Sequence, residues 1–580
     1  MYSKDTLILR QTGEHIRQLR RQCSLTQTEL GGDHYSKSYV SAVERGSMTP
    51  SLVALRFFAE RLNKPHDYFE HFFRPHEQSE HFLLPIHTPF LTRSDVKTPD
   101  INPLLELLLA QSALYPAVLV RRFAALSFED MATFPALAHA RYVFLKGLLA
   151  QKEGEHALAL VAFEHALALT PRQYQAVILD AMGMQYVFGQ HYTVALSYHE
   201  RALGLLEEEW AGASSAATKG DKEKHFDLSL LLELHCGDDC RYSGLYTQAV
   251  KHYTNARNCL RTTHDISVAG QVYLGLGYCL YASLYQRTAL LPSAYSDEEQ
   301  ERAFQQAIGF LLQSRMLYQA SQDLAGETRS RLRHALVLLD FSAWKQQLEG
   351  DKRAFALMQC QALLENAQEQ CEQIVIGWRS AGDKALTAEK TLIFSALAYL
   401  TRVYCQRATL GRLEDHVDTA RLACIRATGL SQKLLEIAAE ENLSWAMVDQ
   451  FLALSKDHPG VYASLPQPPQ HTLLETAGCS SICQYEIYSA IAEVAEERGR
   501  MADTPDYAQL CFSSANKYCQ LALKMIRAAV EKQECDPGYA TRSYRQCISL
   551  LQARTQAALP LSEETAQELL AILKEWTFLY

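Results

Sequence analysis

Hydrophobic residues recur every three or four positions through the first sixty residues of the chain, which is the spacing of one face of a helix. In the segment that Ser36 can cap, Val40 and Val43 fall on one face and polar residues on the other. The same kind of spacing predicts further short helices at residues 14–22 and 51–62. The beginning of the chain is therefore expected to fold as a small helical bundle.

A second helix-start signal lies between these segments. Thr26 and Glu29 have the spacing of a capping box, in which the threonine hydroxyl and the glutamate carboxylate each accept from the other residue's backbone amide. A helix is thus expected to begin here. Gln27 then lies at its amide-rich end, where a neutral donor can reach a DNA phosphate. The Gly31-Gly32 pair should follow as a turn.

The polar face of the segment after Ser36 carries groups suited to nucleic acid. Helical spacing turns Lys37, Ser38 and Ser41 outward, and Arg45 comes near the end. Lysine or serine at a base edge, and lysine or arginine at a phosphate, are the contacts that recognition in the major groove requires. The two short helices and their turn therefore predict a DNA-reading unit.

Residues 12–73 resemble the helix-turn-helix family of phage repressors of the Cro and C1 type, also called xenobiotic-response-element-like. The resemblance rests on Leu19-Arg20, Leu25-Thr26-Gln27, Glu29-Leu30, residues 36–41, Glu44-Arg45-Gly46, Pro50-Ser51 and Leu55. It implies a five-helix domain that binds double-stranded DNA, with a buried structural ion pair between Arg20 and Glu44. The DNA contacts are expected at Gln27, Ser36, Lys37, Ser38, Tyr39, Ser41 and Arg45.

The turn departs from the family pattern. Family members usually have one more residue before the second helix and a glycine nearer to its start, whereas this chain has an early Gly31-Gly32 pair and Tyr35 in the turn. Which of the outward side chains touches a base therefore stays open. The alternative for the whole segment is a helical bundle that is used only for protein contact.

Formal charge is unevenly distributed along the chain. The total is −10, but residues 1–75 contain 11 Lys and Arg against 8 Asp and Glu, a local +3 that leaves −13 for the remainder. A basic head can pair with phosphates while an acidic body is repelled by them. Because +3 is modest, tight binding to a single half-site is not expected, and a homodimer on a two-fold repeat is the usual remedy.

After about residue 100 the chain is rich in Ala, Leu, Tyr and Gln and has few alternating Val and Ile positions, so we expect it to be almost entirely helical. Small and aromatic residues recur in three series: Gly147, Gly154, Ala159, Phe163 and Ala166; Gly183, Ala195, His199 and Ala202; Gly237, Gly244, Ala249, Tyr253 and Ala256. The spacing suits antiparallel helix pairs in which small residues allow close approach and a ring fills the groove beside them. Such pairs stack because none buries its own apolar face.

This pattern resembles the tetratricopeptide repeat. Degenerate units are expected around Gly277 with Ala307, Ala356, Ala420 with Ala427, and Ala508 with Phe512 and Ala515, where irregular helix pairs are the alternative. The predicted fold is all-α: a small five-helix helix-turn-helix domain at 1–75, a semi-rigid linker at 76–103, and a long α-solenoid of tetratricopeptide-like helix pairs at 104–580. Exposed loops are expected at residues 210–221 and 458–471, and the second would divide the solenoid into two lobes.

The first helix of each repeat should line a curved groove, which is the geometric match to an extended peptide. Positions that flank the glycines of these helices are candidates for a ligand-binding surface, and solvated polar residues without a ligand are the alternative. The candidate residues are Arg141, Gln151, Asp180, Asp238, Arg241, Gln271, Tyr278 and Tyr281.

Other chemistry receives little support from the sequence. Cys236 with Cys240, and Cys479 with Cys483, lie one helical turn apart, but no partner pair follows at zinc-ribbon spacing, so we predict no metal and no cofactor. Histidines at residues 66, 71, 76 and 81 rotate around a helix instead of aligning. Phosphate-loop, dinucleotide, nucleophile-elbow and zinc-helix motifs were not found, which argues against an enzyme.

No export signal and no apolar run of spanning length is evident, and fifteen scattered cysteines indicate reduced thiols, so a cytoplasmic protein without membrane association is expected. A repressor-like head before tetratricopeptide repeats resembles the organisation of peptide-pheromone-responsive regulators. This resemblance implies a sequence-specific DNA-binding transcriptional regulator whose solenoid mediates dimerisation and senses a peptide or protein. The alternative is a protein-interaction scaffold whose helical head does not bind DNA.

Overall fold

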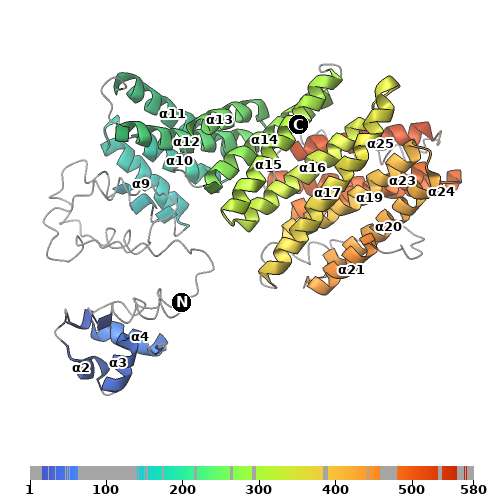
Figure 1. The fold of residues 1–580 in the computed structure, drawn as a ribbon. Coiled ribbons are helices and arrows are strands. Elements are labelled where there is room, and N and C mark those ends of the chain that lie inside the picture. The colour runs from blue at the N-terminus through green and yellow to red at the C-terminus, as the bar shows by residue number, and fades with distance from the viewer. Residues whose placement is uncertain are drawn as a thin grey trace. The chain divides into compact units, whose positions relative to one another are not determined.

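The computed structural model divides the chain into two compact units, Met1–Pro99 and Asp100–Tyr580 (Figure 1). It describes residues 16–62 and 140–172 with short gaps, then 175–213, 219–260, 266–290, 296–382, 390–440, 443–456, 480–532 and 538–557, with isolated positions beyond. Every regular element in these ranges is a helix, as the all-α prediction requires. The predicted linker at 76–103, and the chain on both sides of it from residue 63 to residue 139, lie outside the described residues.

The first unit, which we call the head, is a bundle of short helices. Residues described between 16 and 21 are helical, and α2 (Gln27–Gly31), α3 (Lys37–Glu44) and α4 (Leu52–Arg61) follow. The predicted capping box at the start of α2 and the predicted serine cap of α3 are both confirmed. Its core consists of Ile16, Leu19, Leu30, Val40, Val43, Ala54, Leu55, Phe58, Ala59 and Leu62.

The second unit, the solenoid, is a succession of antiparallel helix pairs. Helical residues between 140 and 151 precede α9 (His156–Leu169). Then α10 (Gln175–Phe188) pairs with α11 (Tyr192–Ala213), α12 (Lys219–Tyr242) with α13 (Tyr246–Cys259), α14 (Ile266–Leu290) with α15 (Asp297–Ala320), α16 (Leu324–Lys345) with α17 (Arg353–Ala381), α19 (Lys390–Leu413) with α20 (Val417–Ala439), and α23 (Ser481–Arg500) with α24 (Pro505–Glu531). A 3-10 turn (Gly350–Lys352) and the helices α21 (Trp445–Lys456) and α25 (Gly538–Gln556) complete the described elements.

The first helices of successive pairs form one layer of the solenoid. From α12 onward, each first helix contacts the first helix of the next pair, through α14, α16 and α19 to α23. We call these five helices the first-helix layer. Figure 1 shows the pairs following one another, with α25 returning from the end of the series to contact α14 and α23. Helices that are far apart in sequence are therefore joined through α25.

The predicted small and aromatic series create the close contacts within the pairs. A Cβ placed on Gly147 would overlap the ring of Phe163, and one on Gly237 would lie 2.9 Å from the ring of Tyr253. These rings are fully buried, so the glycines leave the space that they occupy. The predicted helix pairs at all three series, and at the degenerate units after them, are confirmed.

Two expectations about the breaks differ from the structure. Of the loop predicted at residues 210–221, both ends are helical, because α11 continues to Ala213 and α12 begins at Lys219, and residues 214–218 lie outside the described residues. Alanine favours helix over the start of that segment more than its glycine interrupts it. The loop predicted at residues 458–471 lies outside the described residues. Among the helices that the structure describes, none is long and apolar enough to cross a membrane.

The glycine contacts give a stability prediction with an internal control. A Cβ on Gly326 would overlap the ring of Tyr318, whereas one on Gly309 would meet nothing within 4 Å. Gly326→Ala should therefore destabilise the solenoid by about 1–3 kcal/mol through overpacking. Gly309→Ala, in the interior of α15, should stabilise it by about 0.5–1 kcal/mol. Urea unfolding of both variants measures the difference, and equal effects would contradict the packing role of Gly326.

Candidate functional site

The start of α2 is fixed by local hydrogen bonds. The Glu29 amide donates to Oγ1 of Thr26 at 3.2 Å, and the Thr26 amide donates to Oε2 of Glu29 at 2.6 Å. Hydrogen bonds from the backbone amide and the side chain of Thr26 to the carboxylate lower the pKa of Glu29. The capping box therefore satisfies two backbone amides that the first turn of the helix would leave unpaired.

The turn between α2 and α3 is built on glycine and on aromatic packing. Gly32 has a φ of 54° and a ψ of −145°, a conformation that residues with a side chain rarely adopt. A Cβ on Gly31 would lie 3.3 Å from Val40, so this glycine allows α3 to approach closely. Tyr35 fills the remainder of the turn and packs edge-on against Phe57, with ring centroids 5.3 Å apart. The partly buried Tyr35 therefore packs the turn against α4.

Helix α3 presents a polar outer face. Ser36 accepts from the Tyr39 amide at 3.2 Å, and Lys37, Ser38 and Arg45 are exposed. Tyr39 is half-buried because its ring stacks on Tyr35, with centroids 5.0 Å apart. Among the residues predicted to contact DNA, the exposed ones are Ser36, Lys37, Ser38 and Arg45, and the half-buried ones are Gln27, Tyr39 and Ser41.

A charged cluster joins the first helix of the head to α2 and α3. Arg20 Nε lies 2.5 Å from Glu44 Oε1, Arg20 Nη2 donates to Glu44 Oε2 at 3.1 Å, and Nη1 donates to the Leu25 carbonyl at 2.7 Å. The hydrogen bond with Glu44 raises the pKa of Arg20. Glu44 is only 3 % exposed, so its charge needs this partner. The expected ion pair is present and holds the end of α3 in place.

Gln27 joins the same cluster. Its Nε2 donates to Glu44 Oε2 at 2.8 Å, which leaves the amide oxygen for other contacts. A phosphate contact by Gln27 stays a prediction, and it would be made from a side chain that Glu44 already orients. A prearranged donor loses less rotational freedom on binding than a free one.

In the solenoid, three of the predicted groove residues form one polar group. Asp238 accepts from Tyr253 Oη at 2.6 Å and from Gln271 Nε2 at 2.9 Å, and it lies 3.4 Å from Arg241 Nη2. Arg241 also lies over the ring of Tyr242, 4.4 Å from its centroid. The group is thus held together by contacts within and between α12, α13 and α14. Its role toward a ligand stays a prediction.

Two other predicted residues lie at a tyrosine-rich pocket of the first-helix layer. Tyr278 and Tyr281 are 3 % and 4 % exposed and line the pocket. The other lining residues are Ala282, Tyr285, Leu336, Tyr539 and Arg542. Sequence reasoning missed Tyr539 and Arg542, because α25 follows the last predicted repeat and no repeat spacing points to its position beside α14.

Charges surround this pocket. Arg542 is 5 % exposed, and its nitrogens make no hydrogen bond; the nearest carboxylate oxygens are Asp340 Oδ1 at 3.6 Å and Glu486 Oε2 at 4.0 Å. Burial raises the pKa of Glu486 to about 7, although Arg402 and a hydrogen bond from Tyr399 oppose the shift. The Arg542 guanidinium therefore lies between two buried carboxylates, Asp340 and Glu486, and makes a hydrogen bond with neither.

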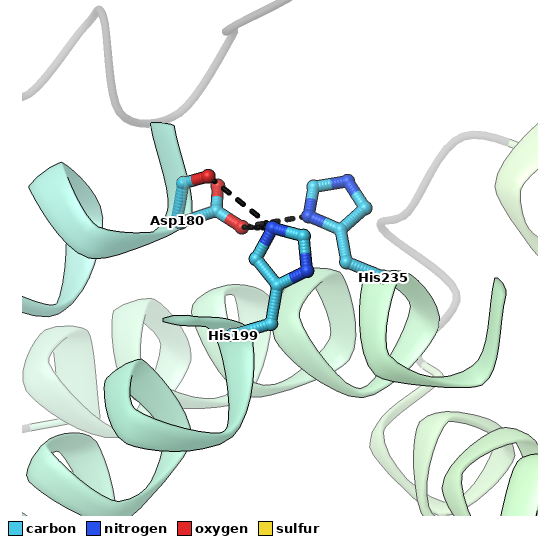
Figure 2. A group of neighbouring side chains, drawn as sticks. All are labelled: Asp180, His199 and His235. Atoms are coloured by element: carbon cyan, nitrogen blue, oxygen red, sulfur yellow. Dashed lines mark hydrogen bonds and ion pairs between the residues drawn. The ribbon is translucent and has the colours of Figure 1, made fainter. Parts of the chain in front are cut away.

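The remaining predicted residues have separate environments. Arg141 lies outside the described residues, and Gln151 is a half-buried helical residue. Asp180 faces two histidines, as Figure 2 shows. Cys236 and Cys240 are fully buried, and burial raises the pKa of Cys240 to about 12, so neither is a ready thiolate.

The candidate histidines at 66, 71, 76 and 81, and Cys479 of the second cysteine pair, lie outside the described residues.

Comparison with known proteins assigns the head. Residues 16–69 match the family model described as Helix-turn-helix, so the head is a helix-turn-helix domain. No curated protein matches the chain.

Two solved structures are similar to the chain at low identity. PlcR of Bacillus thuringiensis, in complex with the peptide PapR7 and DNA, is 15 % identical, with a TM-score of 0.26, and the match covers 54 % of this chain and 98 % of that one. A Rap protein complexed with Competence and Sporulation Factor is 10 % identical, with a TM-score of 0.28, and the match covers 75 % of this chain and 99 % of that one.

Because the Arg20–Glu44 pair lies within the head, its loss should unfold the head and leave the solenoid folded. Arg20→Ala leaves the Glu44 carboxylate buried without its cation, which costs about 3–5 kcal/mol, comparable to the stability of a small domain. Hydrogen exchange measured by mass spectrometry should show loss of protection in residues 16–62 and unchanged protection in α12 to α24. Arg21→Ala, at an exposed neighbouring arginine, is the control. Wild-type protection of the head in Arg20→Ala would contradict the structural role of the pair.

Proposed function

We propose that the chain is a non-enzymatic, sequence-specific DNA-binding transcriptional regulator whose solenoid mediates dimerisation and senses a ligand. The observation that carries the proposal is the helix-turn-helix domain, with α3 held by a buried ion pair and its polar face exposed. Rigid placement of a helix with exposed Lys37 and Arg45 is what reading of a major groove requires.

The DNA-binding role divides between two kinds of contact. Lys37 and Ser38, in the first turn of α3, are positioned for base edges, because recognition helices enter the groove with their N-terminal residues. Arg45, at the other end of α3, suits a phosphate. A head with a formal charge of +3 favours two copies on an inverted repeat over a single copy.

For the sensing role, we propose the tyrosine-rich pocket of the first-helix layer as the ligand site. Arg542 offers guanidinium donors that make no hydrogen bond, and Tyr278, Tyr281 and Tyr539 provide ring surfaces around it. A short peptide with a carboxylate, either a side chain or its C-terminus, matches this chemistry. The cavity has a volume of only about 10 Å³, so such a peptide would have to displace α25 from α14 to reach Arg542. Because the pocket joins α14 to α25, a ligand there would change the curvature of the solenoid only if it binds two curvatures with different affinity.

Site selection from random duplex DNA by the full-length protein tests the DNA-binding role. We expect an enriched inverted repeat whose affinity falls with salt by roughly 0.9 log units per log of salt for each phosphate that is neutralised. Arg45→Ala should weaken binding to all sequences and reduce this slope by about 1. Lys37→Ala should cost about 1–3 kcal/mol and relax the preference at one position of each half-site.

Hydrogen exchange provides the folding control for both variants, since each side chain is exposed and the head should stay folded. If no sequence is enriched, and neither variant changes binding to DNA, the protein-interaction scaffold is the better assignment.

A library of random heptapeptides tests the sensing role. Peptides retained by the full-length protein should bind Arg542→Gln at least tenfold more weakly, because the variant loses the charge that a carboxylate pairs with. Arg421→Gln, at an exposed arginine paired with Asp503, is the matched control and should bind as the wild type does. Equal binding to Arg542→Gln would exclude this pocket, and it would leave the DNA-binding role untouched.

A further inference from the structure

The second helix pair departs from its neighbours at a position that the fold reserves for an aromatic ring. His199 follows Gly183 by sixteen residues, just as Phe163 follows Gly147 and Tyr253 follows Gly237. His199 is fully buried against Gly183, as the two rings are against their glycines. An imidazole therefore replaces a phenyl or phenol ring in the same slot.

A second departure lies one turn before Gly183. Asp180 stands three residues before this glycine, where Phe144 and Leu234 stand before the glycines of the neighbouring pairs. Phe144 and Leu234 are buried core residues, and Asp180 is only 9 % exposed. Burying a carboxylate and an imidazole in place of apolar side chains costs free energy unless both are paired. Two polar replacements that meet in one place indicate a built site.

The replacements meet a third residue from the next pair. His235 Nδ1, on α12, lies 2.7 Å from Asp180 Oδ1, on α10, and His199 Nε2, on α11, lies 3.6 Å from the same oxygen. The three ligand atoms all lie within 4.8 Å of one another. Figure 2 shows both imidazole rings directed toward the carboxylate from different helices.

The surroundings of His199 call for a cation between the rings and the carboxylate. Its Nδ1 lies 2.6 Å from Asp239 Oδ2, so a neutral ring carries its proton on Nδ1. Its Nε2 then directs a lone pair toward Oδ1 of Asp180 and toward the Asp180 carbonyl oxygen, which lies 3.3 Å away. Facing oxygens and a lone pair repel one another, and either a proton on Nε2 or a bound metal ion removes the repulsion.

We infer that Asp180, His199 and His235 form a binding site for a divalent transition metal ion, which nitrogen and oxygen ligands of this kind prefer. Bonds of about 2.0–2.1 Å in a tetrahedron place ligand atoms roughly 3.3 Å apart, between the two separations in the cluster. The Asp239 carboxylate orients His199 as an outer-shell partner does in metal sites. The side chain of His235 is 18 % exposed, so one edge of the cluster reaches solvent.

The charges of the cluster balance with a divalent ion. Two neutral imidazoles, the Asp180 carboxylate and the Asp239 carboxylate sum to −2, which an ion of +2 neutralises. The ion would link α10 and α11 to α12 and so fasten one helix pair to the next.

Titration of metal-stripped, full-length protein with Co²⁺ tests the site. We expect one equivalent to bind with the visible absorption of nitrogen and oxygen ligands, and without the sulfur-to-cobalt band that cysteine ligation would produce. His199→Phe restores the residue type of the first pair, so it should fold and lose this spectrum. His235→Gln should also lose it. Asp239→Asn should keep the spectrum and weaken binding by about 10–100-fold.

His252→Gln is the matched control, because His252 Nδ1 pairs with Glu233 at 2.7 Å and has the same side-chain exposure as His235. It should bind Co²⁺ as the wild type does. Circular dichroism checks that each variant is folded. Failure of the wild type to bind one equivalent, or undiminished binding by folded His199→Phe and His235→Gln, would overturn the assignment and leave a hydrogen-bonded histidine–aspartate cluster.

Discussion

A helix pair of this solenoid cannot bury its own apolar face, and the whole second unit follows from that constraint. Each pair must pack against the next, and small residues allow a close approach, as where Gly275 of α14 faces the Tyr253 ring of the preceding pair. The slot for that ring is fixed by the backbone, but its occupant is not. Among the three clear repeats, the chain places packing rings there at Phe163 and Tyr253 and an imidazole at His199. The same repeating position thus holds a packing ring in some helix pairs and a proposed metal ligand in another.

The head meets a similar requirement by charge. It is too small to be held by its apolar core alone, and Glu44 places a carboxylate inside it. Arg20 and Gln27 both bind that carboxylate, so the first helix and α2 converge on the end of α3. The same three side chains that stabilise the domain therefore also set the direction of the helix that faces solvent.

Sequence reasoning succeeded where signals are local. The caps at Thr26 and Ser36 define α2 and α3 because their partners lie three residues away. The sixteen-residue spacing of glycine and ring predicted the helix pairs for the same reason. Tyr281 was predicted to line a ligand-binding surface, but it is buried. Its hydroxyl donates to Asp340, which lies 59 residues away, and repeat spacing does not predict a contact at that distance. The cluster around Arg542 depends on contacts between helices that are distant in sequence, and no periodicity of the chain predicts them.

Helix α25 changes the connectivity of the solenoid. Stacked repeats ordinarily form an open series in which each unit touches only its neighbours, so that unfolding can begin at an end and spread. Here Arg333 of α16 donates to the hydroxyl of Tyr539 of α25, across 206 residues of sequence. That bond and its neighbours turn a linear array into a closed loop with high contact order. The contacts that close this loop can form only once α25 has been synthesised, after the repeats that they join.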